Sequence, residues 1–253
     1  MNRVIAIVNR KGGSGKTVTV FNLAGAFAEA GKTVLTIDLD PQGSLSKGLK
    51  LHPTNPPLSQ VLIKGGEGFD SLIQPTNIEN LFVIPADRDL NAIETGLREI
   101  PGRELRLRRC FKKFLTRKFD YILVDTPPSL GALSQNALVA ADGVLIPIDG
   151  GTYGRDALGT TLDVIDFIKE EINYTLKLLG ILICNVKSFT VFDQSAEAVI
   201  REQFGDLVFE TVISNSIKVD EAAEAGLPLV FYKRTFRLSE RYRELARDID
   251  ARR

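Results

Sequence analysis

The chain of 253 residues is poor in the side chains that most metal and redox sites require. It contains one histidine, two cysteines and one methionine. Cys110 and Cys184 are far apart and form no Cys-x-x-Cys pair, which excludes a zinc finger and is typical of a reducing compartment. The single histidine, His52, argues against histidine-based catalysis.

Charge of one sign and long apolar runs are also lacking. The 32 basic and 32 acidic residues balance, so no overall field attracts the chain to nucleic acid or to a membrane. No apolar run approaches the roughly 20 residues of a spanning helix, and the first residues lack the pattern of a signal peptide. We therefore expect a cytoplasmic protein.

What the sequence does contain is an alternation of apolar, β-branched segments with helical patterns. This alternation predicts the α/β class, with a mostly parallel twisted sheet and helices on both faces. A stretch rich in proline and glycine, 49–78, reads as a loop or insertion within a single domain, 1–253. We expect strands over 4–8, 32–38, 81–85, 121–125, 143–147 and 178–184, and helices over 88–99, 103–117, 132–141, 154–171 and 192–204.

The stretch NRKGGSGKTVTV, residues 9–20, indicates a phosphate-binding loop. Its Gly15-Lys16-Thr17 ends the pattern G-x-x-x-x-G-K-[ST], although Arg10 stands where the first glycine is expected. An apolar strand precedes the loop and a helical pattern follows it, which aims backbone N–H groups and a helix N-terminus at a phosphate. The predicted nucleotide-binding residues are Lys11, Gly12, Gly13, Ser14, Gly15, Lys16, Thr17 and Val18.

Three aspartates follow the ends of predicted strands. Asp38 and Asp125 each end an apolar segment, and Asp40 comes two residues after Asp38. Carboxylates at this edge of a parallel sheet, beside a phosphate loop, are typical of a magnesium site. Each aspartate taken alone also suits a loop or helix cap.

These motifs together resemble the ParA family of deviant Walker ATPases. The resemblance rests on KGGSGKT (11–17), DLDPQG (38–43) and DTPPS (125–129), and extends to 226–228. It implies a P-loop NTPase of the deviant Walker A type, similar to the short members that lack an N-terminal helix-turn-helix.

The resemblance also implies roles for the catalytic residues. The additional lysine, Lys11, would reach across a two-fold interface to the nucleotide of a second copy. Burying the charge of ATP between two chains requires cations from both, so the role is physically reasonable. Lys16 would bind the β- and γ-phosphates, and Asp40 would orient the attacking water. A solvated surface lysine is the alternative for Lys11.

The implied cofactors are ATP and Mg²⁺. Thr17 would coordinate the metal, with Asp38 and Asp125 holding its waters. Asn185 resembles the residue that contacts adenine in relatives, although a loop asparagine that caps a turn is equally compatible with the sequence. The chain has Ser-Asn-Ser at 214–216, where relatives often carry Pro-Arg-Asn beside the base, so the resemblance does not settle whether this segment contacts adenine.

Basic residues gather in two segments. From 98 to 118 there are nine Lys or Arg against two acids, and from 232 to 253 there are eight against four. Members of the family bind DNA without sequence preference through basic residues toward the C-terminus, and such binding is electrostatic. The predicted DNA-binding residues are Lys218, Lys233, Arg234, Arg237 and Arg241. A solvated helix face is the alternative for both segments.

The sequence thus predicts a slow, partner-stimulated ATPase that forms an ATP-dependent homodimer, binds non-specific DNA at the nucleoid and segregates or positions a cargo. A plasmid, a chromosome origin and a protein assembly such as a carboxysome remain open, with an adaptor of the ParB or cargo-adaptor type. The alternative is a MinD-like ATPase at a membrane. This chain lacks the paired cysteines that an iron–sulfur reductase needs for its cluster. The DPQG motif (40–43) argues against a metabolic P-loop ligase.

Overall fold

A computed structural model of the protein describes residues 3–96, 102–149, 153–186 and 191–252. In these ranges the chain forms one eight-stranded sheet with the order β3-β4-β2-β5-β1-β6-β7-β8. The strands are β1 Arg3–Ile7, β2 Val34–Asp38, β3 Gln74–Pro75, β4 Leu81–Ile84, β5 Tyr121–Asp125, β6 Gly143–Asp149, β7 Lys177–Val186 and β8 Val208–Ser214.

The sheet is parallel except for β3, a two-residue edge strand that pairs antiparallel with β4. The central strands are buried on both faces, which is why they read as continuous apolar runs. The chain leaves β1 toward β2 on one side and returns to β6 on the other side. The crevice at the carboxyl end of β1 is therefore a topological switch point, where α/β sheets bind ligands.

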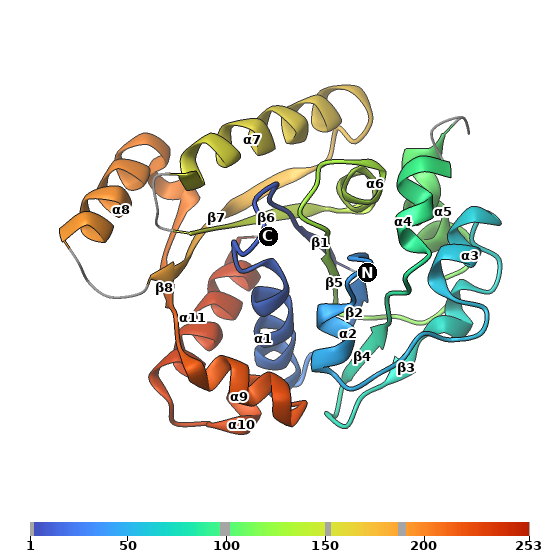
Figure 1. Cartoon of the computed structure of the whole chain (residues 1–253), viewed down its shortest axis with the longest axis horizontal. Coiled ribbons are helices and arrows are strands. Elements are labelled where there is room, and N and C mark those ends of the chain that lie inside the picture. The colour runs from blue at the N-terminus through green and yellow to red at the C-terminus, as the bar shows by residue number, and fades with distance from the viewer. Residues whose placement is uncertain (1–2, 97–101, 150–152, 187–190, 253) are drawn as a thin grey trace.

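Helices cover both faces of the sheet (Figure 1), so the predicted fold class is confirmed. One core cluster lies under α3 to α8, and the other lies under α1, α2 and α9 to α11. The helices are α1 Lys16–Glu29, α2 Ser44–Gly48, α3 Leu58–Ile63, α4 Leu90–Gly96, α5 Arg106–Lys113, α6 Ala132–Ala140, α7 Tyr153–Glu171, α8 Val191–Phe204, α9 Ile217–Ala225, α10 Leu229–Tyr232 and α11 Arg237–Ala251.

The C-terminal helix α11 packs against α1 through one apolar stripe. Its buried side chains include Tyr242, Leu245, Ala246 and Ile249. A side chain added at Gly25 of α1 would lie 2.3 Å from the Cβ of Pro228, the residue before α10. The helices on this face therefore approach one another closely.

Several segments differ from the sequence-based expectation. The stretch 49–78 contains α3, a 3₁₀ turn over Phe69–Leu72 and β3, so only part of it is irregular. The helix expected over 103–117 is shorter, because it begins as a 3₁₀ turn and ends at Lys113. The edge strand β8 and the helices α2, α9 and α10 were not expected. The last residues of the helix expected over 88–99 lie outside the described residues.

Candidate nucleotide site

The glycine-rich loop joins the end of β1 to the first turn of α1. Gly13 and Gly15 have φ angles of +73° and +93°, in the left-handed region that glycine adopts without strain. A Cβ on Gly15 would also lie 3.2 Å from the Cβ of Cys184, on β7. The turn and the close approach of β7 both require glycine at position 15.

Asn9 fixes the backbone on which the loop starts. Its buried side chain donates from Nδ2 to the Pro147 carbonyl on β6 at 2.7 Å, and its Oδ1 accepts from the backbone N–H of Lys11 at 2.8 Å. The hydroxyl of Thr161 on α7 accepts from the N–H of Arg10 at 3.4 Å. The loop is therefore tied to β6 and α7 before it reaches its first glycine.

A cavity of about 360 Å³ lies at this loop. The predicted residues from Gly12 to Val18 line it, together with the predicted Asp40 and Asn185. Ser44 and Pro128 complete the lining. The structure thus brings most of the sequence-predicted nucleotide residues to one concave surface.

Lys16 begins α1 and is buried beneath the loop. Its Nζ donates to the backbone carbonyl of Lys11 at 3.1 Å. Burial lowers the pKa of Lys16, whereas the negative charges of Asp125 and Asp40 raise it. A triphosphate beside this ammonium group would add further negative charge and favour the protonated lysine.

Asp38 and Asp125 lie directly opposite each other in the paired strands β2 and β5. Both carboxyl groups are fully buried. Burial raises the pKa of Asp38 to about 6, against the opposing effect of its hydrogen bonds to Ser46. Burial and the neighbouring charge of Asp38 also raise the pKa of Asp125. A divalent cation nearby would favour the ionised form of both groups.

The two carboxylates differ in their hydrogen bonds. Asp38 accepts from the N–H of Asp40 at 3.1 Å, and from the N–H and hydroxyl of Ser46 at 2.9 and 2.6 Å. Both oxygens of Asp125 are buried without a complete hydrogen bond, although the hydroxyl of Thr17 acts on this carboxyl group and lowers its pKa. Buried acceptors without a complete hydrogen bond suit metal-bound water, so Asp125 fits a Mg²⁺ site better than Asp38 does.

The protein supplies few direct metal ligands. Within the described ranges, no group of three or more His, Cys, Asp or Glu side chains is arranged to hold a metal ion by itself. This arrangement suits Mg²⁺, which keeps several waters and takes one or two protein ligands plus substrate phosphates. Thr17, the predicted metal ligand, lies on the cavity wall next to Lys16.

Lys11 lies beside the cavity and does not line it. Its ammonium group forms an ion pair with the carboxylate of Asp149, the last residue of β6. The two side chains are 28% and 25% exposed, so water reaches the pair. The additional lysine of the loop is therefore held by its own chain.

Asn185 contacts the loop from the end of β7. Its Nδ2 donates to the carbonyl of Gly13 at 2.6 Å, and its φ of +57° is a turn conformation. Nearby, the N–H of Asn215 donates to Val186, and Ser216 caps α9 by accepting from the N–H of Lys218 at 3.2 Å. Asn185 thus supports the loop and also lines the cavity.

The predicted DNA-binding residues lie around α9 and the start of α11. Lys218 pairs with Glu221 at 2.5 Å and Arg241 pairs with Glu244 at 2.6 Å. The other three predicted residues, Lys233, Arg234 and Arg237, are exposed. Intrachain carboxylates therefore neutralise part of the expected basic surface.

Sequence reasoning missed three polar residues that organise the site: Asn9, Asp149 and Ser46. Asn9 reaches Pro147, and Lys11 reaches Asp149, only because β1 and β6 are neighbours in the sheet, which the sequence alone does not disclose. A signal for Ser46 was present, since a hydroxyl residue follows DPQG by three positions.

The sequence matches the AAA domain family AAA_31 over residues 2–178. It is 35% identical over 253 residues to the sporulation initiation inhibitor protein Soj of Bacillus subtilis, covering 99% of each chain. The chain belongs to the ParA family of P-loop ATPases.

Two solved structures place this ParA-family fold among nucleotide complexes. A McdA variant from Cyanothece in complex with ATP is 26% identical, with a TM-score of 0.87, over 98% of this chain and 96% of the other. Cobyrinic acid a,c-diamide synthase from Mycobacterium smegmatis, with bound ADP and magnesium, is 32% identical with a TM-score of 0.82, over 98% and 93%.

Among the described residues, no helix of this ParA-family chain combines the length and the hydropathy that crossing a bilayer requires.

Proposed function

We propose that this protein is a ParA-type ATPase that dimerises with ATP, binds DNA without sequence preference and segregates or positions a cargo. The observation that carries the proposal is the position of Lys11. Asn9 anchors its backbone next to Gly12 on the cavity wall, while its side chain extends to Asp149 instead of the cavity. Once it separates from Asp149, a cation placed in this way would be free to contact a neighbouring chain.

The proposed cofactors are ATP and Mg²⁺. Lys16 would bind the terminal phosphates, and Thr17 and Asp125 would hold the metal, which neutralises charge on the phosphates. The buried oxygens of Asp125, which lack a complete hydrogen bond, support this assignment. Asp40, which lines the cavity, would orient the attacking water. With positioning and charge neutralisation as the main effects, slow hydrolysis is expected.

Dimerisation follows from the charge of the nucleotide. ATP carries about four negative charges, and their burial between two chains requires cations from both sides. In a symmetric pair each Lys11 would contact the partner's triphosphate. The dimer would weaken after hydrolysis, because the contacts to the γ-phosphate are lost.

The proposal of a cargo and an adaptor rests on similarity to relatives, and no residue of this chain identifies either of them. Relatives about 35% identical to this chain are named for chromosome partitioning, so a nucleoid-bound cycle driven by a ParB or cargo-adaptor type of protein is the proposed context.

A MinD-like attachment to membrane finds less support. Such attachment needs a C-terminal helix with a free apolar face. In α11 the apolar stripe of Tyr242, Leu245 and Ile249 is buried in the core. Leaving the core to meet a bilayer would expose that stripe and the surface of α1 beneath it.

An electrophoretic shift on non-specific duplex DNA, with ATP, with ADP and without nucleotide, tests the proposal. We expect a shift with ATP and a much weaker one otherwise. Equal binding in all three conditions would contradict the nucleotide switch. Absence of a shift, combined with flotation on anionic vesicles, would favour the membrane alternative.

A further inference from the structure

Helix α5, Arg106–Lys113, has one apolar side and one strongly basic side. Leu107 and Cys110 are fully buried against the sheet, and Phe111 packs beside them. The rest of the helix carries five cations in eight residues: Arg106, Arg108, Arg109, Lys112 and Lys113. The helix lies between α3 and α6, on the face of the sheet that is opposite α11.

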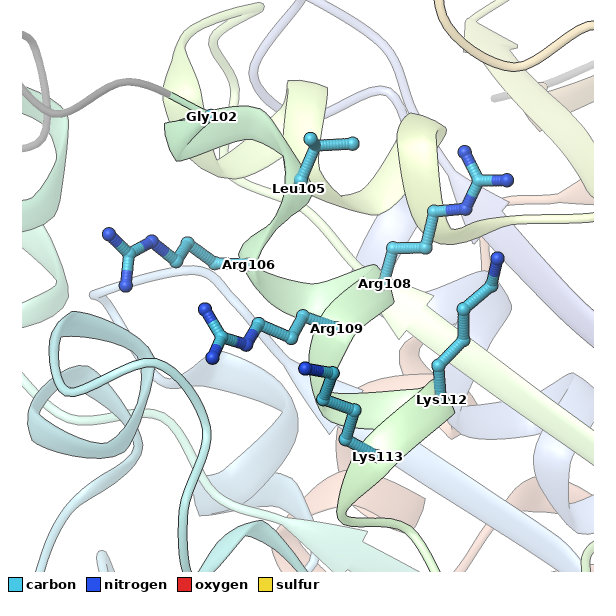
Figure 2. Close-up of a pocket in the computed structure, with 7 residues that line it drawn as sticks. All are labelled: Gly102, Leu105, Arg106, Arg108, Arg109, Lys112 and Lys113. Carbon is cyan, nitrogen blue, oxygen red and sulfur yellow. The ribbon is translucent and has the colours of Figure 1, made fainter.

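The five cations form two rows (Figure 2). Arg106, Arg109 and Lys113 extend to one side of the helix, and Arg108 and Lys112 extend to the other side. With Gly102 and Leu105 they line a cavity of about 470 Å³. Residues three or four apart on a helix have Cβ atoms about 5–6 Å apart, so each row is a regular series of positive charges.

None of these cations is neutralised by the described part of the chain. No carboxylate of the described residues lies within ion-pair distance of any of the five side chains. Arg106 and Arg108 donate only to the carbonyls of Ile63 and Ile172, at 3.3 and 3.5 Å. On α11, in contrast, Arg241, Arg243 and Arg247 all pair with glutamates.

We propose that the basic face of α5 is a second DNA-binding surface, which contacts the phosphate backbone of duplex DNA. The inference rests on the proposed DNA binding and adds a location that is separate from the C-terminal residues. Unpaired cations gain more from a polyanion than paired ones, because no internal ion pair has to be broken and bound counterions are released. Arg and Lys are also the common donors to phosphate oxygens.

The composition of this face favours DNA over other anionic partners. A protein interface has an apolar or aromatic core, whereas cations dominate this face. Its exposed large apolar side chains among the described residues are Leu105, 40% exposed, and Ile63 at its edge on α3, 45% exposed. An interfacial helix inserts an apolar side into lipid, and the apolar side of α5 is buried in the core. A series of cations without an apolar centre matches a series of phosphates.

The test removes three positive charges from α5 and, in a matched control, three elsewhere. The α5 variant is Arg109→Gln, Lys112→Gln and Lys113→Gln, three exposed side chains with no hydrogen bond among the described residues. The control is Arg88→Gln, Lys169→Gln and Lys177→Gln. These three side chains are exposed, and the control removes the same residue types as the α5 variant. Circular dichroism melting verifies that both variants fold.

Binding of a labelled 30-base-pair duplex with ATP is measured by fluorescence anisotropy at several salt concentrations. The slope of log K against log salt is negative, and loss of three phosphate contacts reduces its magnitude by about 2.7. The same loss weakens binding on the order of 100-fold near 0.1 M salt. We expect this change in the α5 variant, and a much smaller change in the control.

The outcomes separate the inference from the proposed function. If the wild-type chain binds DNA and the α5 variant and the control show the same slope, the inference is wrong while the proposed function stands. If the wild-type chain binds no DNA in any nucleotide state, both are wrong. If the α5 variant keeps its DNA affinity but loses binding to anionic vesicles, the partner is lipid and the inference is overturned.

Discussion

Lys11 and Asp149 form an ion pair at the carboxyl ends of the neighbouring strands β1 and β6, within one chain. If Lys11 contacts the nucleotide of a second copy, it must first leave Asp149. The pair therefore opposes dimerisation, and the strength of this opposition can be measured.

Asp149→Ala should favour dimerisation, because it removes the counter-ion of Lys11. Partly exposed ion pairs contribute up to about 1 kcal/mol, so releasing Lys11 should lower the ATP concentration for half-maximal dimerisation by as much as about fivefold. Sedimentation velocity across an ATP titration measures this midpoint. Lys11→Ala, in contrast, should abolish the ATP-dependent dimer, and an intact ATP dimer of that variant would contradict the role of Lys11.

Asp40→Ala should produce a dimer that forms with ATP and dissociates more slowly than the wild-type dimer. Asp40 lines the nucleotide cavity, and losing the group that orients water slows hydrolysis without removing phosphate contacts. Phosphate release and dimer lifetime are the measurements. Turnover equal to that of the wild-type chain would remove Asp40 from this role.

Asp125→Asn should weaken magnesium-dependent ATP binding at least about tenfold, because it removes the charge of a buried carboxylate whose oxygens lack a complete hydrogen bond. Calorimetric titration with ATP, in the presence of Mg²⁺ or of a chelator, measures the difference. Asp87→Asn is the matched control, since Asp87 is a buried carboxylate that accepts from Ser59 and Asp89 instead. Similar losses in both variants would point to a general effect on stability.

Burial raises the pKa of both thiols, Cys110 and Cys184, to about 12. The native chain should therefore resist thiol reagents at pH 8 and react at two sites per chain when unfolded. The contribution of each thiol to stability is complete below the unfolded pKa of about 9 and is lost as the pH rises toward 12.

Between pH 9 and 10.5 the loss is on the order of 2 kcal/mol per thiol. The free energy of unfolding, compared between the wild-type chain and a Cys110→Ala, Cys184→Ala variant at both pH values, isolates this effect from that of other titrating groups. A constant difference between the two proteins would contradict the raised pKa.

Two helical glycines should respond in opposite ways to alanine. At Gly25 the new methyl group would lie 2.3 Å from Pro228, so α1 and the segment before α10 must move apart, at a cost of about 1–3 kcal/mol. At Gly159, on α7, no atom lies within 4 Å of the added Cβ, and the substitution should stabilise by about 0.5–1 kcal/mol. Urea denaturation measures both, and equal effects would contradict the close packing at Gly25.

The sequence predicted the central strands well because β1, β2 and β5 are buried on both faces and are therefore uniformly apolar. It failed at the sheet edges. In β8 the exposed residues Glu210 and Ser214 interrupt the apolar pattern, and β3 has two residues, too few for any pattern. The proline-rich stretch 49–78 concealed α3, a helix of six residues.

In the site, the loop and its aspartates were recognisable because their spacing is local. The difference in hydrogen bonding between Asp38 and Asp125 was not recognisable, since it depends on the hydroxyl of Ser46 on α2, which donates to Asp38. The ion pair of Lys11 with Asp149 depends on strand order, and 138 residues separate the two side chains along the chain.

The side chain of Asn9 hydrogen-bonds both the backbone N–H of Lys11 and the carbonyl of Pro147. Pro147 lies two residues before Asp149, the counter-ion of Lys11. Release of Lys11 from Asp149 then needs only rotation about the bonds of the lysine itself, on a picosecond-to-nanosecond timescale. Such a step is far faster than any encounter between proteins, so the rate of assembly would scale with the square of the ATP-loaded monomer concentration.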